Sequence, residues 1–350
     1  MPLDRAAHYA VIGLFVIVAG WVVSRVPAIV NPILLAILLN FLLSPLVRRL
    51  RRRGVPGAVS ATLLLALLFA GVGATTAVLA RPAAAWIERI PESRARIRML
   101  TRAVRERVAP VMEAATEVQE AAREMETPGR RAQEVKVAEQ TLVRRVADRA
   151  TSLAAGAVMT FFLALLLLAP GDVFHQKLLG LLPTSQYREQ VQRISDEVEQ
   201  RVSRYLGSLV LINTGVGLVT GVAMWLAGLP NPALWGVVAG VLNFVPYLGA
   251  LATVVVIALA SLLTFDDLSR AAVAPLVFLG LNLLEGNLVT PKLVERWLKL
   301  NAVAAFLAIV VFWALLGVPG ALMAVPILVV IKVIFDHVES LKGIGTFLGA

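Results

Sequence analysis

Several apolar stretches, each about the length that a helix needs to cross a lipid bilayer, constrain the fold of this chain most. A helix rises about 1.5 Å per residue and the hydrocarbon core is about 30 Å thick, so about 20 apolar residues make one span. Hydrophobic residues make up 58% of the chain and charged residues only 16%, which departs from the composition of soluble domains. The sequence therefore predicts an all-α, polytopic membrane protein with about six full spans, near residues 9–24, 28–47, 58–80, 152–169, 205–228 and 271–290.

The charged residues indicate how the spans are oriented. Five arginines in RRLRRRG, residues 48–54, follow the second span, and short basic loops of this kind stay in the cytoplasm. With an even number of crossings, we expect both termini in the cytoplasm and the chain in the cell (inner) membrane. The net charge of +10 fits this topology. The arginines lack the aromatic interleaving of a nucleic-acid-binding surface, so we expect membrane lipid and not nucleic acid as a partner.

Two polar segments separate the spans. Residues 81–150 contain an apolar stripe typical of an amphipathic helix, at Ile97, Leu100, Val104, Val108, Val111, Ala115, Val118, Ala122 and Met125. TPGRR at 127–131 predicts a turn, so we expect a projecting amphipathic helical hairpin. This hairpin either packs on itself or forms contacts in a homo-oligomer. Residues 172–203 predict a helix on the cytoplasmic membrane surface, because one face carries Val191, Ile194, Val198, Val202 and Tyr205.

Two long apolar segments near the C-terminus must be broken. Residues 231–263 would form a helix about 50 Å long, far more than a membrane needs, and Pro246 and Gly249 favour a break. Residues 301–334 have the same form, with a break expected among Gly317, Pro319, Gly320 and Pro326. Each segment either re-enters the membrane as a hairpin or crosses it, and both alternatives stay open. Broken helices at membrane depth are tolerated where protein or water surrounds them, so they indicate a substrate site.

These patterns divide the chain into four parts. Three N-terminal spans occupy residues 1–80 and the polar helical hairpin occupies 81–150. The fourth span and the surface helix occupy 151–203. Residues 204–350 form a C-terminal core that contains both broken segments.

Glu285 is an acidic residue within the predicted span at 271–290. It lies about two-thirds of the way across the hydrocarbon, where a charge costs about 2.5–3.5 kcal/mol on insertion scales, so exposure to lipid is disfavoured. Asn282 lies one turn earlier and Asn287 lies close to the end of the span. These side chains could bind a polar solute, a cation or a proton. Alternatively, Glu285 forms a structural ion pair with Lys292 or Lys332, and both interpretations stay open.

Residue types that carry other chemistry are scarce. The chain has no cysteine, and its three histidines, His8, His175 and His337, are scattered. No metal-ligand spacing, Gly-rich phosphate loop or activated nucleophile is recognisable. We therefore expect neither a metal nor a cofactor, and no enzymatic activity.

Three strings resemble the signatures of a known family of prokaryotic membrane proteins, the autoinducer-2 exporter (AI-2E) transporters. They are LEGNLVTPKL at 284–293, NFVPYLGAL at 243–251 and LGVPGALMAVPILVVIK at 316–332. The resemblance extends from the first spans to the C-terminus and is most specific from about 204 to 335. It implies a secondary carrier that exports small polar molecules without ATP hydrolysis. Some members are described as sodium or lithium to proton antiporters.

The resemblance also carries residues over by motif. The Glu-Gly-Asn to Pro-Lys element corresponds to Glu285, Gly286, Asn287, Pro291 and Lys292. The broken-helix element corresponds to Asn243, Pro246, Tyr247 and Gly249. With Asn282 and Asn213 added to the polar residues of these motifs, the candidate substrate- or ion-binding residues are Glu285, Asn282, Asn287, Asn243, Tyr247 and Asn213. The chain departs from the family at Glu295 and Lys299, where the family usually has glycine.

Three functional hypotheses follow. The leading one is a secondary transporter that exports a small polar solute, such as autoinducer-2 or a related metabolite, alone or in exchange for protons. The second is a sodium (lithium) to proton antiporter in which Glu285 carries the exchanged charge. The third is a membrane scaffold that transports nothing and binds other proteins through the polar hairpin.

Overall fold

The computed structural model of the chain describes residues 11, 13–15, 18, 20–92, 139–171, 179–246, 248–290, 292 and 300–349. These residues are helical almost throughout, and the β-structure among them is limited to one isolated antiparallel bridge between Leu300 and Gly349. The predicted all-α fold is confirmed. The chain forms two compact units, one made of Met1–Thr75 with Ser152–Ala350 and the other of Thr76–Thr151.

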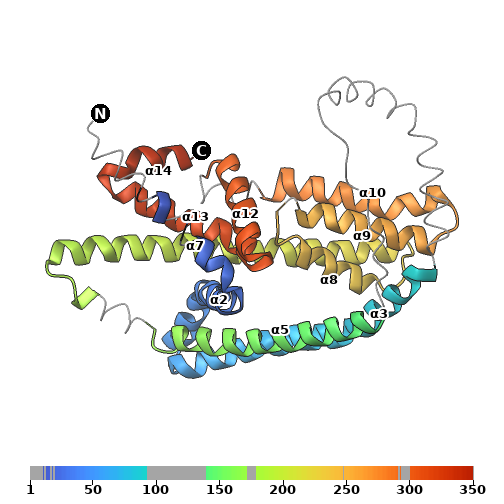
Figure 1. The fold of residues 1–350 in the computed structure, drawn as a ribbon, viewed down its shortest axis with the longest axis horizontal. Helices are drawn as coiled ribbons and strands as arrows, with labels where there is room; N and C mark the ends of the chain where they lie inside the picture. The colour runs from blue at the N-terminus through green and yellow to red at the C-terminus, as the bar shows by residue number, and fades with distance from the viewer. Residues whose placement is uncertain are drawn as a thin grey trace, which may run out of the picture. The chain divides into compact units, whose positions relative to one another are not determined.

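Figure 1 shows the helices of the chain. In chain order the elements are α2 (Pro27–Arg52), α3 (Gly57–Glu92), α5 (Glu139–Leu168), α7 (Ser185–Leu226), α8 (Pro232–Leu242), α9 (Leu248–Thr264), α10 (Leu268–Leu284), the π-helix η1 (Glu285–Val289), α12 (Ala302–Leu316), α13 (Val318–His337), the short 3₁₀-helix η3 (Glu339–Leu341) and α14 (Lys342–Leu348).

Five of the helices within the described ranges are long and apolar enough to cross a membrane: Pro27–Arg52, Gly57–Glu88, Ser185–Leu226, Leu268–Val289 and Val318–His337. The predicted spans at 28–47 and 58–80 fall within the first two, and those at 205–228 and 271–290 overlap the next two to within two residues. The predicted span at 152–169 corresponds to a shorter apolar helix, Ser152–Leu168. Much of the predicted span at 9–24 lies outside the described residues, and residues 20–25 are helical.

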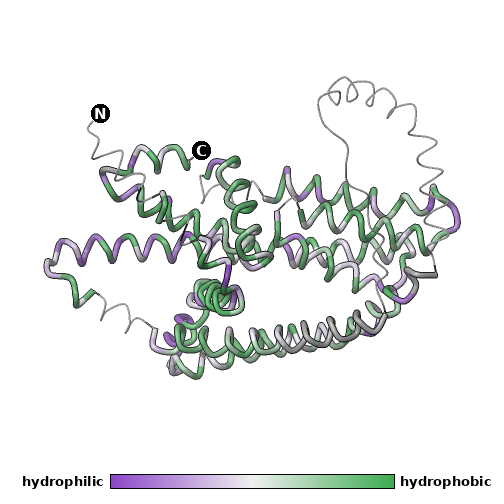
Figure 2. Tube along the Cα trace, viewed as in Figure 1, coloured by the Kyte–Doolittle hydropathy of each residue, from purple (hydrophilic) through white to green (hydrophobic). Residues whose placement is uncertain are grey.

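The prediction of a separate surface helix before the fifth span was wrong. Residues 185–226 form one continuous helix, α7. Other helices cover part of its apolar stripe, because Val198, Val202 and Tyr205 are buried in a cluster with residues of α13 and α12. Figure 2 shows hydrophilic residues recurring along the first part of α7, whereas hydrophobic residues dominate α8, α9 and α10. The helix therefore joins a polar half to an apolar half.

Both predicted helix breaks are present. The chain leaves the helix between α8 and α9, next to Pro246, and again between α12 and α13 at Gly317. Gly317 has φ of 68°, a conformation that favours glycine. A Cβ atom at Gly249 would lie 1.8 Å from the carbonyl oxygen of Leu242, and one at Gly320 would lie 2.1 Å from that of Phe312. These two glycines let the halves of each pair approach closely at the break.

Pro326 does not break a helix. It lies inside α13, which continues to His337, and it is buried. Proline removes one backbone hydrogen bond, and a buried helix in a membrane protein tolerates that loss where neighbouring protein surrounds it. For both broken segments, re-entry into the membrane and crossing of the membrane stay alternative predictions.

Two apolar clusters hold the larger unit together. The first joins α2, α3 and α5, and Phe69 contacts Phe161 edge to face beside it, with ring centroids 5.5 Å apart. The second joins α7, α12 and α13 and includes Val245, next to the first helix break. The predicted stripe at 97–125 and the predicted turn at 127–131 lie outside the described residues.

Candidate transport site

Two buried asparagines meet where α8 ends. The Nδ2 atom of Asn243 donates a hydrogen bond of 2.9 Å to the Oδ1 atom of Asn213 in α7. Asn213 is 1% exposed, and its own Nδ2 atom has no hydrogen-bond partner among the described residues. A buried amide donor without a partner is costly unless something else accepts its hydrogen bond. Asn213 therefore has the chemistry to bind a polar group.

Glycines on both helices explain why the two asparagines can meet. Gly217 and Gly221 on α7 face Gly236 and Gly240 on α8, each pair spaced by four residues. A Cβ atom at Gly236 would lie 2.6 Å from the carbonyl oxygen of Gly217, so the two backbones are nearly in contact. Small residues at this spacing let membrane helices approach closely. The close approach brings Asn243, one turn beyond Gly240 along α8, within reach of α7.

This glycine contact was not among the sequence-based expectations. The spacings Gly217 to Gly221 and Gly236 to Gly240 are readable in the sequence and indicate helix packing in membranes. Along the same contact lies a groove of about 560 Å³ that Asn213, Thr214 and the four glycines help to line. Its volume lies within the range of small-molecule sites.

Glu285 begins a π-helical segment. α10 ends at Leu284, and residues Glu285–Val289 form η1, in which the amide of Thr290 donates to the carbonyl oxygen of Glu285. The Glu285 side chain is partly buried and accepts a hydrogen bond from the Thr290 hydroxyl group. π-Helical turns within helices frequently occur at functional sites. The backbone is thus irregular at the residue for which the sequence predicted a polar role.

The other residues predicted around Glu285 are less buried. Asn287 is exposed and donates a hydrogen bond of 2.8 Å to the carbonyl oxygen of Leu283, and Asn282 is partly buried. Lys292 is exposed, and within the described part of the chain it forms no ion pair with Glu285. Tyr247 and Pro291 lie outside the described residues.

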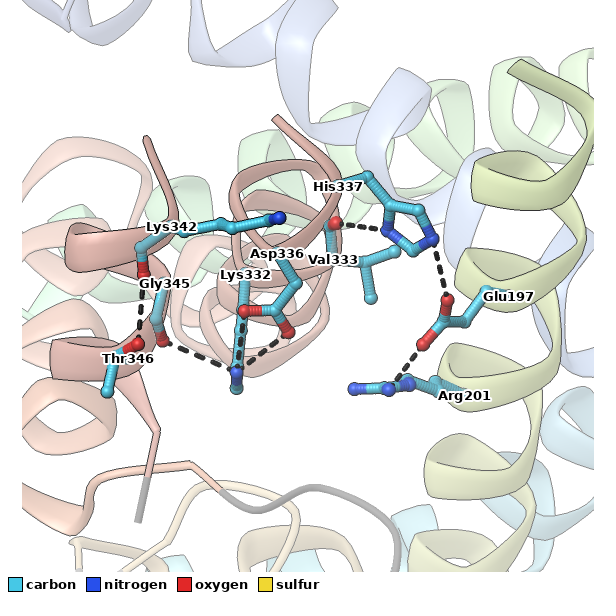
Figure 3. A network of polar contacts seen from close by, with 9 residues as sticks. All are labelled: Glu197, Arg201, Lys332, Val333, Asp336, His337, Lys342, Gly345 and Thr346. Atoms are coloured by element: carbon cyan, nitrogen blue, oxygen red, sulfur yellow. Dashed lines mark hydrogen bonds and ion pairs between the residues drawn. The ribbon is translucent and has the colours of Figure 1, made fainter. Parts of the chain in front are cut away.

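Lys332 has a different partner from the one predicted. Its ammonium group contacts both carboxylate oxygens of Asp336, at 3.1 and 2.8 Å, and donates to the carbonyl oxygen of Gly345 at 3.3 Å (Figure 3). Lys332 is only 9% exposed. The predicted pair between Lys332 and Glu285 was therefore wrong, because Asp336, one turn further along α13, binds the ammonium group. Lys332 instead attaches α14 to α13.

A second polar contact in Figure 3 joins α13 to α7. The Nδ1 atom of His337 lies 2.9 Å from the carbonyl oxygen of Val333, and the Nε2 atom lies 3.4 Å from a carboxylate oxygen of Glu197. Glu197 also pairs with Arg201. A carbonyl only accepts, so Nδ1 carries a proton, and Nε2 can donate to Glu197 only in the imidazolium form.

The described residues offer no obvious metal centre. No group of three or more His, Cys, Asp or Glu side chains is placed to hold a metal ion within the described ranges. The polar groups around the first helix break are amides and hydroxyls, which bind solutes through hydrogen bonds.

The fold and these polar groups define a class: a polytopic α-helical membrane protein whose apolar core contains a polar site beside a helix break. The family model described as AI-2E family transporter matches residues 10–340. The chain therefore belongs to the AI-2E transporter family, and the resemblance seen in its sequence is confirmed.

Curated relatives carry names that agree with this family. The chain is 30% identical over 162 residues to the putative transport protein YrrI of Bacillus subtilis, covering 46% of this chain and 45% of the relative. It is 28% identical over 162 residues to the AI-2 transport protein TqsA of Escherichia coli, covering 45% and 44%. It is 27% identical over 309 residues to the putative transport protein MT0215 of Mycobacterium tuberculosis, covering 87% and 82%. The chain thus spans less than half the length of the first two of these relatives.

Proposed function

We propose that this protein is a secondary transporter that exports a small polar solute without ATP hydrolysis, and that Asn213 and Asn243 bind the solute. The observation that carries the proposal is the buried Nδ2 atom of Asn213, a donor without a partner in the described structure, beside the break between α8 and α9. A solute hydroxyl or carbonyl group that accepts this hydrogen bond removes the penalty of the unpaired donor. The name of the Escherichia coli relative, an AI-2 transport protein, makes autoinducer-2 the first solute to test.

The helix contacts suggest which parts move. The backbones of α7 and α8 are nearly in contact at their glycines, so these two helices move as one body. The break next to Pro246 separates α8 from α9, and we place the change in backbone angles there. Movement of α9 relative to α7 and α8 would expose the asparagine pair to one side of the membrane and then to the other, as alternating access requires.

A second candidate function is cation to proton exchange at Glu285. Its carboxylate lies in a helix apolar enough to span a membrane, in a π-helical turn, with one described hydrogen bond from Thr290. Ionisable groups within spans are expensive and mark ion or proton pathways. In this function Glu285 would release its proton when a sodium or lithium ion binds, and bind a proton when the cation leaves.

Reconstitution into liposomes distinguishes these functions. Proteoliposomes with an internal pH dye would receive gradients of Na⁺, Li⁺ or autoinducer-2, and solute content would be measured in parallel. The variants are Asn213→Leu and Glu285→Gln, and the matched carboxylate control is Glu339→Gln, whose side chain is 95% exposed.

The proposal predicts solute movement that Asn213→Leu abolishes and Glu339→Gln leaves unchanged. A pH change that accompanies this movement would assign proton coupling. Proton flux driven only by Na⁺ or Li⁺ and lost in Glu285→Gln would select the antiporter instead. No movement of solute or protons under any gradient would refute both transport functions.

A further inference from the structure

A second, more polar cavity lies away from the asparagine pair. It has a volume of about 620 Å³ and is bounded by α2, by the end of α5 with residues 170 and 171, and by α7. The volume falls in the range typical of small-molecule sites. Unlike the groove between α7 and α8, this cavity is lined by charged side chains as well as by amide and hydroxyl groups.

The polar side chains form a row on each helix. On α2, Asn40, Ser44 and Arg48 are spaced by four residues and so share one face, and Arg51 follows three residues later. The α7 wall carries a matching row with spacings of three and four: Gln192, Ser195, Asp196 and Glu199. The polar row of α2 and the row in the polar half of α7 therefore line opposite walls of the cavity.

Hydrogen bonds fix the walls of the cavity. The Glu199 Oε1 atom accepts a hydrogen bond of 2.7 Å from the Ser44 hydroxyl group and also pairs with the Arg48 guanidinium. The Gln192 amide donates to the Oδ1 atom of Asp196 at 2.9 Å. Arg48 and Glu199 neutralise each other, so they orient the walls without leaving an excess charge.

Arg51 is the second cation that lines the cavity. Within the described ranges it forms no ion pair, and it is exposed at the cavity. Its guanidinium lies against Gly171, where a Cβ atom would be 2.2 Å from the Nη1 atom of Arg51. A residue without a side chain at this position therefore leaves space for the guanidinium. Arginine presents a planar set of donors that matches a carboxylate or a phosphate group.

We propose that this cavity binds a small hydroxylated organic anion. The guanidinium of Arg51 binds the carboxylate or phosphate group, and Asn40 and Ser195 exchange hydrogen bonds with the hydroxyl groups. Asp196 accepts a hydroxyl hydrogen through Oδ2, since Gln192 occupies Oδ1. The proposal concerns binding alone and holds whether or not the Asn213 pair binds an exported solute.

Calorimetric titration of the full chain in nonionic detergent tests the site. The probes are gluconate, glucose 6-phosphate and neutral glucose, and the variants are Arg51→Gln and Arg52→Gln. Arg52 is the matched control, because it is an exposed arginine on the same turn of α2 that does not line the cavity. Loss of a charge-assisted hydrogen bond corresponds to about a tenfold or larger change in affinity.

We expect one or both anions to bind the native chain at least about tenfold more tightly than glucose. Arg51→Gln should weaken anion binding by about the same factor, and Arg52→Gln should leave it within about twofold. Preference for gluconate would identify a carboxylate ligand and preference for glucose 6-phosphate a phosphate ligand. Equal binding of glucose, equal affinities in Arg51→Gln and the native chain, or no binding of either anion would overturn the proposal.

Discussion

Gly236→Ala is predicted to destabilise the protein by forcing α7 and α8 apart. The added Cβ atom would lie 2.6 Å from the carbonyl oxygen of Gly217 and 3.0 Å from the Cα atom of Gly221. Both are backbone atoms, so no side chain can rotate out of the way. The helices must separate by several tenths of an ångström before the contact becomes an ordinary one.

The size of the effect follows from two opposing terms. Overpacking of a close contact typically costs about 1–3 kcal/mol, and a gap of about 0.5–1 Å elsewhere in the interface loses a quarter to a half of the dispersion attraction there. Replacement of glycine by alanine within a helix returns up to about 1 kcal/mol. The net expected loss for Gly236→Ala is about 1–2 kcal/mol.

The control is Gly215→Ala on α7. A Cβ atom at Gly215 would meet nothing within 4 Å, so only the helix-propensity gain remains. Substitutions at Gly240, Gly217 and Gly221 should fall between these extremes, because their nearest backbone oxygens would lie at 2.8, 2.9 and 3.5 Å. SDS titration of the purified protein in nonionic micelles, followed by tryptophan fluorescence, measures the free energy of unfolding.

The sign of the difference tests the reasoning. Gly236→Ala should unfold at lower SDS than the native chain, and Gly215→Ala at equal or higher SDS. If Gly236→Ala is as stable as Gly215→Ala, the two backbones are not in contact, and the glycines do not explain the Asn213 to Asn243 hydrogen bond.

Two further predictions use the same unfolding measurement, and a third uses the melting temperature. Lys332→Met should lower the free energy of unfolding by about 1.5–3 kcal/mol, because the buried ammonium bonds Asp336 and Gly345, whereas the same change at an exposed lysine such as Lys342 should have little effect. Gly317→Ala should cost about 1–3 kcal/mol, because φ there is 68°, and an unchanged stability would refute the helix break at that residue. The hydrogen bond from the Ser269 hydroxyl, with the amides of Arg270 and Ser269, holds the pKa of Asp267 below its ordinary value. The stabilisation from this cap is therefore complete above about pH 4 and lost as pH falls through the lowered pKa, so the difference in melting temperature between the native chain and Asp267→Ala should shrink in acid; a constant difference would contradict the assignment.

The helix breaks were predictable because their cause is local. Proline lacks an amide donor and clashes with the preceding turn, so Pro246 marked the first break, and the GVPG string at 317–320 marked the second. Pro326 has the same chemistry, yet α13 continues through it within a buried surrounding. The difference lies in what packs around each proline, which the sequence does not specify.

The continuous α7 helix was not predictable from its apolar stripe. A stripe such as Val198, Val202 and Tyr205 can be covered equally by lipid headgroups or by another helix. The structure buries it against α12 and α13, and the buried residues of these two helices lie more than 100 positions away in the sequence. The Arg48 to Glu199 pair is out of reach of sequence reasoning for the same reason, since 151 positions separate its partners.

Some contacts of the site could have been predicted from the sequence but were not. Lys332 and Asp336 are four residues apart on one helix, a spacing that favours an ion pair. The sequence therefore favoured Asp336 over Glu285 as the partner of Lys332. Asn213 and Asn243 were each identified as candidates. Their contact depends on the close approach of α7 and α8 at the glycines of 217–221 and 236–240. The spacing of these glycines is visible in the sequence and indicates close packing of two membrane helices.

Cysteine accessibility tests most directly the central claim, that water reaches a polar site at the break between α8 and α9. The chain contains no cysteine, so a single introduced thiol is the sole target for a charged methanethiosulfonate reagent in intact membranes. Thiols react as thiolates, which form in water and not in lipid. We predict that Asn243→Cys is labelled while Leu251→Cys, at a 63% exposed apolar position in α9, is not. If Asn243→Cys is as unreactive as Leu251→Cys, water does not reach the break and the proposed transport site is wrong.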